Sequence, residues 1–197
     1  MTVHGSVLPR AFYARDAREV APDLLNKVLV HGNRAARIVE VEAYMGGDDP
    51  GSHAYRGMTP RTTVMFGPPG HMYVYFTYGM HWCANAVCGP DGVAMAVLLR
   101  AGGPVAGLEA MRASRPKART DRDLCSGPGK LCQALGIDKA HNGTDLVTSG
   151  PGGVHVVDDG MPPPPHPAVS VRVGLSAGAD LPWRWFVAGD PNLSRKG

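Results

Sequence analysis

The alternating run MYVYFTYGMHW, residues 72–82, constrains the fold of this chain more than any other stretch. Successive side chains of a β-strand point to opposite faces, and here one face is aromatic or polar while the other is apolar. Tyr78 and Gly79 fall where the chain must reverse, and glycine adopts the positive φ of a tight turn at little cost. The sequence predicts strands at about 72–78 and 81–88 with an exposed tyrosine at the turn. The aromatic face carries Tyr73, Tyr75 and Thr77, and the core face carries Val74 and Phe76.

A second alternating run, RIVEVEAY at residues 37–44, predicts a strand with a core face of Val39, Val41 and Ala43. Its other face carries Glu40, Glu42 and Tyr44, with the two glutamates roughly 6.5–7 Å apart along the strand. Such a face is typical of a strand side turned to water. It also suits the floor of a cleft, because paired carboxylates at such separations serve glycoside hydrolysis. The pattern alone leaves both interpretations open.

The remaining patterns indicate a mixed α/β fold, α+β-like, in a single domain of residues 1–197 without internal repeats. Helices are predicted at about 16–25, 104–114 and 126–137, the last capped by Ser126 and ended by Gly136. Further strands are predicted at about 27–32, 36–44, 93–101, 169–174 and 183–188, with loops at 45–62 and 161–167.

Composition narrows the class of protein. Apolar residues make up 44% of the 197 residues, enough for one covered core, and no apolar run is long enough to cross a membrane. The N-terminus lacks the apolar segment of a signal peptide, so we expect a cytoplasmic protein, nucleoid-associated if bacterial. The cysteine spacings C-x4-C and C-x6-C do not match zinc knuckles, so we expect buried or free thiols and no metal or other cofactor. These are Cys83, Cys88, Cys125 and Cys132.

Positive charge is concentrated in one segment. The formal net charge is only +3, yet residues 112–130 carry six lysines and arginines against two aspartates. A basic stretch in a near-neutral chain suggests a phosphate-rich partner, although a solvated loop has the same composition. An exposed aromatic side chain beside basic residues is suited to entering stacked bases.

Several motifs together resemble one known family. The stretch VEAYMGGDDPGSHAYRGMTPRTTVMFGPPGHMYVYFTYGMHWCANAV is followed by VLLRA and then by DRDLCSGPGKLCQALGI. In order and approximate spacing these are similar to the alkyladenine (3-methyladenine) DNA glycosylase family, the mammalian AAG type. The resemblance covers essentially the whole chain. It implies a curved, mainly antiparallel sheet flanked by helices, with a protruding β-hairpin that enters DNA.

The resemblance also implies roles for individual residues. Glu42 would position and deprotonate the attacking water, and Arg100 would help to hold it and meet a phosphate beside the flipped nucleotide. The base-binding pocket would be lined by Tyr44, His53, Tyr75 and Asn85, of which Asn85 would exclude normal guanine by crowding its amino group. Tyr78, with Met80 beside it at the hairpin tip, would intercalate where the base has left. Lys130, near the start of its helix, would contact a phosphate.

The implied reaction is base excision from double-stranded DNA that contains damaged purines, alkylated and in some cases deaminated. The enzyme would act as a monomer and away from membranes. No lysine falls in the segments that we assign to the pocket, so we expect single-step hydrolysis without strand cleavage. A monofunctional glycosylase is therefore the expected activity.

The pocket assignment constrains the hairpin. If Tyr75 and Asn85 line one pocket, they must share a face of the sheet. Pairing Tyr78 with Trp82 achieves this and leaves a three-residue loop, 79–81. Any odd loop keeps the faces matched, whereas an even loop needs a bulge. We therefore predict an odd loop or a bulge within 76–85.

Two other classes of function compete with this interpretation. A non-catalytic single-stranded nucleic-acid-binding protein would use the tyrosines for stacking. A small nucleoside or sugar hydrolase would use Glu40 and Glu42 as its catalytic pair. The basic segment and the exposed Tyr78 argue against the hydrolase. Glu42 argues against the binder, because a protein that only binds a polyanion gains nothing from a carboxylate there.

Overall fold

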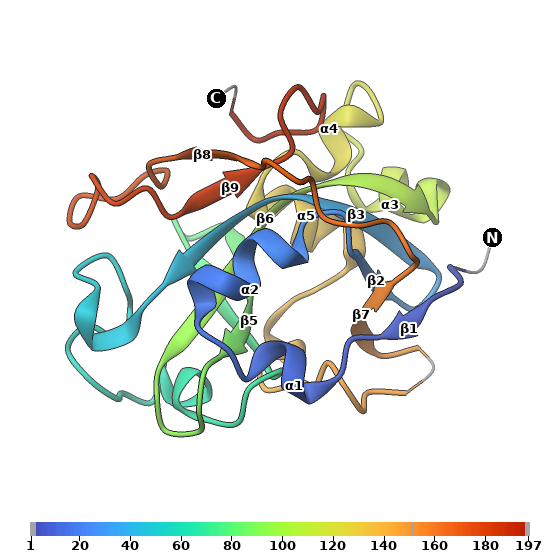
Figure 1. The fold of residues 1–197 in the computed structure, drawn as a ribbon. Helices are drawn as coiled ribbons and strands as arrows, with labels where there is room; N and C mark the ends of the chain where they lie inside the picture. Colours follow the sequence, from blue (N-terminus) through green and yellow to red (C-terminus); the bar gives the residue numbers. More distant parts are fainter. Residues whose placement is uncertain (1–2, 151, 196–197) are drawn as a thin grey trace.

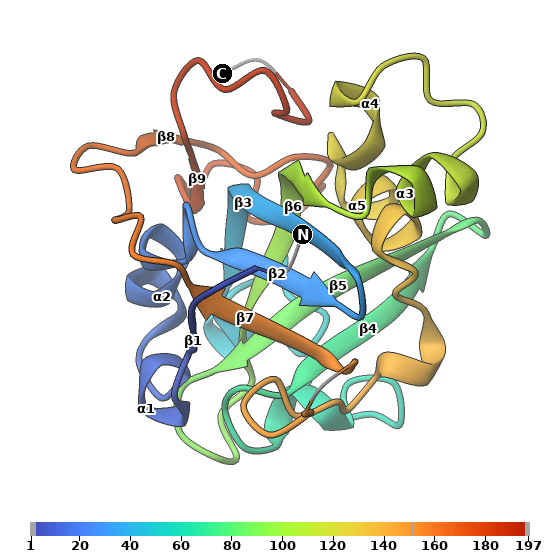
Figure 2. The ribbon, with the colours of Figure 1, turned by 90° about the vertical axis from the view of Figure 1, so that its right-hand side faces the viewer.

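One antiparallel sheet runs through the computed structural model, which describes residues 3–150 and 152–195 (Figure 1). Seven of its strands pair side by side in the order β1-β7-β2-β3-β6-β5-β4. Off this row, β9 pairs with β3, and β8 pairs with β9. The strands are β1 (Ser6–Val7), β2 (Val28–His31), β3 (Arg34–Tyr44), β4 (Met72–Thr77), β5 (His81–Cys88), β6 (Met95–Ala106), β7 (Val154–Asp158), β8 (Ala168–Ser170) and β9 (Arg184–Phe186). The long strands β3 and β6 form its centre, and the sheet is curled (Figure 2).

Short helices flank the sheet. In Figure 2, α1 and α2 lie at the left of the view, and α3 to α5 lie at the upper right. The described helices are α1 (Arg10–Tyr13), α2 (Ala17–Leu24), α3 (Leu108–Ser114), α4 (Arg122–Cys125) and α5 (Pro128–Leu135), with 3-10 turns η1 (Gly46–Asp48), η2 (Thr63–Phe66) and η3 (Lys139–His141). The predicted class, a mixed α/β fold with a mainly antiparallel sheet, is confirmed. Within the described residues, no helix has the length and hydrophobicity needed to cross a bilayer.

The main core lies between one face of the sheet and the helices α2 and α5. The apolar positions of α2 recur at helical spacing, and the Asp16 carboxylate caps the helix by accepting from the Arg18 backbone N–H. In α5, Leu131 and Leu135 pack into the same core. The helical spacing predicted both helices, which the structure confirms. All four cysteines are buried free thiols, as expected.

Two predicted helix ends need correction. The N-cap of α5 is Gly127, because Pro128 takes the first helical position, and the Ser126 hydroxyl accepts from Lys130 Nζ. Gly136 ends the helix in the left-handed conformation, as predicted. The helix predicted at 104–114 begins only at Leu108, because residues 104–106 extend β6 and pair with the start of β3.

The C-terminal strands are shorter than predicted. Strand β8 ends at Ser170 instead of about 174, and β9 spans only Arg184–Phe186. Residues 171–174 leave the sheet and carry side chains and backbone groups toward β3, as described below. Strands β1 and β7, which form one edge of the sheet, were not predicted from the sequence.

The second face of the sheet carries the polar and aromatic residues singled out above. The loop between β3 and β4 covers part of this face with a small cluster around Tyr73 and Met65. The C-terminal segment after β8 covers another part. Strand register places one residue from each of four neighbouring strands in a row, namely Tyr73, Asn85, Leu98 and Glu42. The fold therefore brings these positions together from segments far apart in the sequence.

Candidate active site

Glu42 lies on this second face and is completely buried, at 0% exposure. Its Oε2 accepts hydrogen bonds from the Tyr44 hydroxyl at 2.9 Å and from Arg100 Nη1 at 3.2 Å. Its Oε1 accepts from the Val173 backbone N–H at 2.7 Å. The alternative of a face turned to water is therefore wrong. The C-terminal segment, which no local pattern linked to β3, closes over this part of the strand.

Glu40, two residues upstream, is equally buried and has its own partners. Its Oε1 accepts from Arg100 Nε at 2.9 Å and from Arg184 Nε at 2.8 Å. Ser194 donates to both Glu40 oxygens, its hydroxyl to Oε1 and its backbone N–H to Oε2, each at 2.7 Å. Burial alone would raise the pKa of Glu40, but the Arg100 charge and the hydrogen bonds from Arg184 and Ser194 hold it below the usual value.

Arg100 connects the two carboxylates. It projects from β6, is nearly buried, and pairs with both Glu40 and Glu42. This pairing fixes the plane of its guanidinium group, because a planar group with several donors matches carboxylate oxygens well. Its Nη2 donates to the Ser194 hydroxyl at 3.2 Å, and Arg100 also lines the cavity described next.

A cavity of about 440 Å³ opens beside this network. It brings together most of the residues that the sequence singled out. Its walls include Tyr44, His53, Tyr75, Tyr78, Arg100 and Lys130. A smaller recess of about 60 Å³ adjoins it and is lined by Asn85 and Tyr73 together with Tyr44, His53 and Tyr75. Glu42 does not line the cavity itself, but its three hydrogen-bond partners Tyr44, Arg100 and Val173 do.

Aromatic rings form the inner wall. Tyr73 and Tyr75 are stacked with their ring centroids 5.6 Å apart, and His53 meets Tyr75 edge-on at 4.5 Å. Loss of water around the His53 ring and the nearby Arg61 charge lower the pKa of His53 to about 4. Burial raises the pKa of Tyr75, so its phenol stays protonated at neutral pH. The wall is therefore uncharged.

Tyr44 lines the same cavity and recess, and another residue packs against its ring. The Arg172 guanidinium lies 4.6 Å from the Tyr44 ring centroid and pairs with the buried Asp49. Burial, with the Glu42 charge next, raises the pKa of Tyr44, so its hydroxyl remains a donor to Glu42. Sequence reasoning missed Arg172 and Asp49, because their contact spans 123 positions of the chain.

Asn85 is held in a fixed orientation at the base of the recess. Its side-chain amide donates to the Tyr73 carbonyl at 3.0 Å, directly across the hairpin. The residue is buried and lines the recess. Alternation along β4 predicted that Tyr73 shares this face, although no sequence pattern assigned it to the pocket.

The hairpin tip differs from the prediction by one position. Thr77 pairs with His81, which leaves a three-residue loop of residues 78–80 in place of 79–81. The odd loop is confirmed, and Tyr75 and Asn85 share a face. Tyr78 is 80% exposed and Met80 68% exposed, so the predicted exposed tyrosine is confirmed.

One hairpin residue is exposed where the sequence predicted a core position. Phe76 was predicted in the core but is 46% exposed, because the hairpin projects beyond the helices that cover the sheet. It packs instead on Trp82 across the hairpin, with the ring centroids 4.7 Å apart. Trp82 therefore supports the projecting end of the hairpin.

The position of Lys130 differs from the expectation that no lysine lies at the pocket. No lysine was expected at the pocket, yet Lys130 lines the cavity from the first turn of α5, where its Nζ donates to Ser126. In the described part of the chain, no three His, Cys, Asp or Glu side chains converge in a way that could hold a metal ion.

The chain is similar to one known protein family over most of its length. A family described as Methylpurine-DNA glycosylase (MPG) matches residues 11–191. A protein of Burkholderia cenocepacia (strain HI2424), named "Putative 3-methyladenine DNA glycosylase", is 59% identical over 96% of this chain and 92% of its own length. Proteins with the same name from Streptomyces avermitilis and Methanocella arvoryzae are 50% and 48% identical, over 95% and 96% of this chain and 90% and 96% of their own lengths.

Proposed function

This chain belongs to the methylpurine-DNA glycosylase family, and we propose that it hydrolyses the bond between an alkylated purine and its deoxyribose in duplex DNA. Its activity is that of a 3-methyladenine DNA glycosylase in base excision repair. One observation supports the proposed mechanism most. Beside an aromatic-walled cavity, a buried carboxylate, Glu42, is held by Tyr44 and Arg100, and both of these residues also line the cavity.

Base flipping is the first step of this proposal. A base inside a duplex hides its glycosidic bond, and extruding the nucleotide costs a few kcal/mol. Tyr78 projects from the hairpin tip beside the cavity, so its ring can stack in the gap that the nucleotide leaves. Damaged bases pair or stack less well, so they flip more readily than normal bases.

Recognition follows from the charge of the lesion. Alkylated purines carry positive charge, which the electron-rich faces of Tyr44 and Tyr75 attract. Because the His53 pKa is lowered to about 4, its imidazole is neutral at pH 7 and does not repel the base. Asn85 lies in the recess, where its amide would crowd the exocyclic amino group of guanine.

Hydrolysis follows from the free lone pairs of Glu42. Its Oε1 has one hydrogen-bond donor, the Val173 N–H, so a second lone pair there can accept from a water. As the base leaves with the glycosidic electron pair, the water oxygen bonds to the sugar C1′ and its proton passes to Glu42. The carboxylate also stabilises the oxocarbenium-like sugar, while Arg100 holds Glu42 and meets the adjacent phosphate.

We expect Glu42→Gln to lose excision by at least about a hundredfold, because the amide keeps the shape but is no longer a base. The measurement is single-turnover release of 3-methyladenine or ethenoadenine from a duplex with one lesion, scored for free base and abasic sites. Binding of the lesion duplex should persist. Near-normal release by this variant would refute the mechanism. Release without any abasic site would refute glycosylase activity itself.

The same assay tests whether the reaction is a single hydrolytic step. Because Lys130 lines the cavity, borohydride is added during turnover to trap any lysine–sugar adduct. We expect no trapped species and no strand cleavage in wild type. An adduct that disappears in Lys130→Gln would instead assign a nucleophilic role to Lys130.

A further inference from the structure

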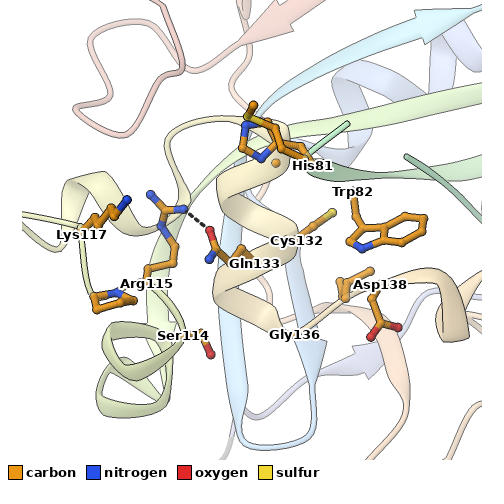
Figure 3. Close-up of a pocket in the computed structure, with 13 residues that line it drawn as sticks. His81, Trp82, Ser114, Arg115, Lys117, Cys132, Gln133, Gly136 and Asp138 are labelled. Carbon is orange, nitrogen blue, oxygen red and sulfur yellow. Dashed lines mark hydrogen bonds between the residues drawn. The ribbon is translucent and has the colours of Figure 1, made fainter. Parts of the chain in front are cut away.

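A second and larger hollow, of about 760 Å³, lies beside the cavity (Figure 3). We call it the outer groove. Helix α5 forms its floor, residues 114–117 form one side, and the hairpin residues Met80, His81 and Trp82 form part of the other. In Figure 3, Arg115 and Lys117 lie on one side of α5, and Trp82 and Asp138 lie on the other.

The outer groove and the cavity share a wall. His81, Arg115 and Gly129 line both of them. At this wall α5 approaches the hairpin closely, because a Cβ built on Gly129 would lie only 2.9 Å from His81 Cβ. The hairpin tip, with Tyr78 facing the cavity and Met80 facing the outer groove, stands between the two hollows.

The groove carries positive charge on one side. Arg115 Nη1 donates to Gln133 at 2.7 Å, and its Nε is buried without a hydrogen-bond partner (Figure 3). Lys117 is exposed and makes no ion pair with any residue that the structure describes. The one carboxylate of the groove, Asp138, lies across α5 from both cations and accepts from the Ala140 N–H.

We propose that the outer groove binds the phosphate backbone of the DNA strand opposite the flipped nucleotide, with Lys117 and Arg115 as the contacts. The proposal rests on the function proposed above. If the cavity takes the flipped nucleotide, the damaged strand must run along the cavity side of the tip. The groove lies across the tip from it, and the strand across the inserted Tyr78 is the undamaged one.

Charge and continuity support this occupant. The groove continues from the cavity through a shared wall, so a duplex that fills the cavity passes over the groove as well. Its cations are not neutralised by carboxylates on their own side of α5. Arginine and lysine are the side chains that contact phosphates in protein–DNA interfaces, and these contacts fix the position of the protein on the duplex.

Lys117→Ala tests the proposal, because Lys117 lines the outer groove alone. Binding of lesion duplex is measured against salt concentration with the matched control Arg119→Ala, an exposed cation two residues away that lines neither hollow. We expect Lys117→Ala to lower the magnitude of the salt slope by roughly 0.9, whereas Arg119→Ala leaves it unchanged. For a fourfold rise in salt, wild type then loses about 3.5 times more affinity than the variant. Equal slopes for wild type and Lys117→Ala would overturn the proposal.

Binding to a single-stranded substrate shows which of the two DNA strands the outer groove contacts. On a single-stranded lesion oligonucleotide, the proposal expects wild type and Lys117→Ala to bind equally, because the opposite strand is missing. A loss for Lys117→Ala on single strands as large as on duplex would place the damaged strand in the groove and overturn the assignment. Lesion release by wild type is scored in parallel, so failure of the glycosylase function is distinguished from failure of the groove.

Discussion

At the scale of single residues, His53 shows how the aromatic wall of the cavity can stay uncharged beside a cationic substrate. Its ring packs edge-on against Tyr75, and its Nδ1 lies 3.2 Å from the Tyr73 hydroxyl. Both the loss of water around the ring and the charge of Arg61 oppose protonation, which lowers the pKa of His53 to about 4. An imidazolium at this place would repel a positively charged base.

This lowered pKa predicts a loss of stability as the pH falls from about 6.5 to about 4. The unfolded chain takes up the proton near the upper value and the folded chain near the lower one, so the unfolded state binds more protons in between. Because His53 is an exposed residue, solvent screening keeps the effect below the full size of the shift. Urea unfolding at about pH 7 and about pH 5 should show a larger loss for wild type than for His53→Gln. Equal losses would contradict the pKa assignment.

At the scale of the element, the hairpin of β4 and β5 combines an exposed tip with a rigid base. Both Tyr78 and Gly79 adopt positive φ, at 52° and 64°. For glycine this is inexpensive, but for tyrosine the left-handed region costs about 1–2 kcal/mol. The turn thus holds an aromatic side chain in a strained, outward position. Such strain is found where the surrounding structure fixes a residue for function.

We expect Tyr78→Ala to excise a lesion from duplex poorly, while excision from a single strand falls much less. The reason is that the ring fills the gap in a stack, and a single strand has no partner base to displace. Single-turnover rates on both substrates give the comparison. Tyr78→Phe, which keeps the ring, is the control and should stay close to wild type. An equal loss on both substrates would assign Tyr78 to the base pocket rather than to the tip.

Patterns within one element were predictable from the sequence, and this covers much of the sheet. Alternation placed Glu42 with Tyr44, and Tyr73 with Tyr75, on shared faces, because side-chain direction in a strand follows from residue parity. The exposed tip and the helical face of α2 followed from equally local rules. The individual roles came from the family resemblance and remain predictions.

At the scale of the whole molecule, the sequence was silent on what covers that face. Ser194 meets Glu40 across 154 positions, and Val173 meets Glu42 across 131. No periodicity links such distant segments, so the pattern could not distinguish a solvated strand face from a buried one. The outcome depends on the C-terminal segment, which leaves the sheet after β8 and closes over β3. Glu40 is thus tied to the C-terminal segment, which changes what its substitution should do.

Glu40→Gln should therefore act mainly on stability. Arg184, Arg100 and Ser194 all donate to the two Glu40 oxygens, so an amide nitrogen at either place would face a donor. Breaking a buried ion pair by removing one partner costs about 3–5 kcal/mol. We expect a loss of this size in urea unfolding.

Excision by the folded Glu40→Gln enzyme should fall far less than in Glu42→Gln, because Glu40 reaches the cavity only through Arg100. Ser194→Ala serves as the milder control, since it removes one neutral donor and keeps both carboxylates, at a cost of about 1 kcal/mol. Both variants are compared with Glu42→Gln below their melting temperatures. If Glu40→Gln abolished release while leaving stability intact, the catalytic carboxylate would be Glu40, and the burial of Glu42 beneath Tyr44 and Arg100 would be structural.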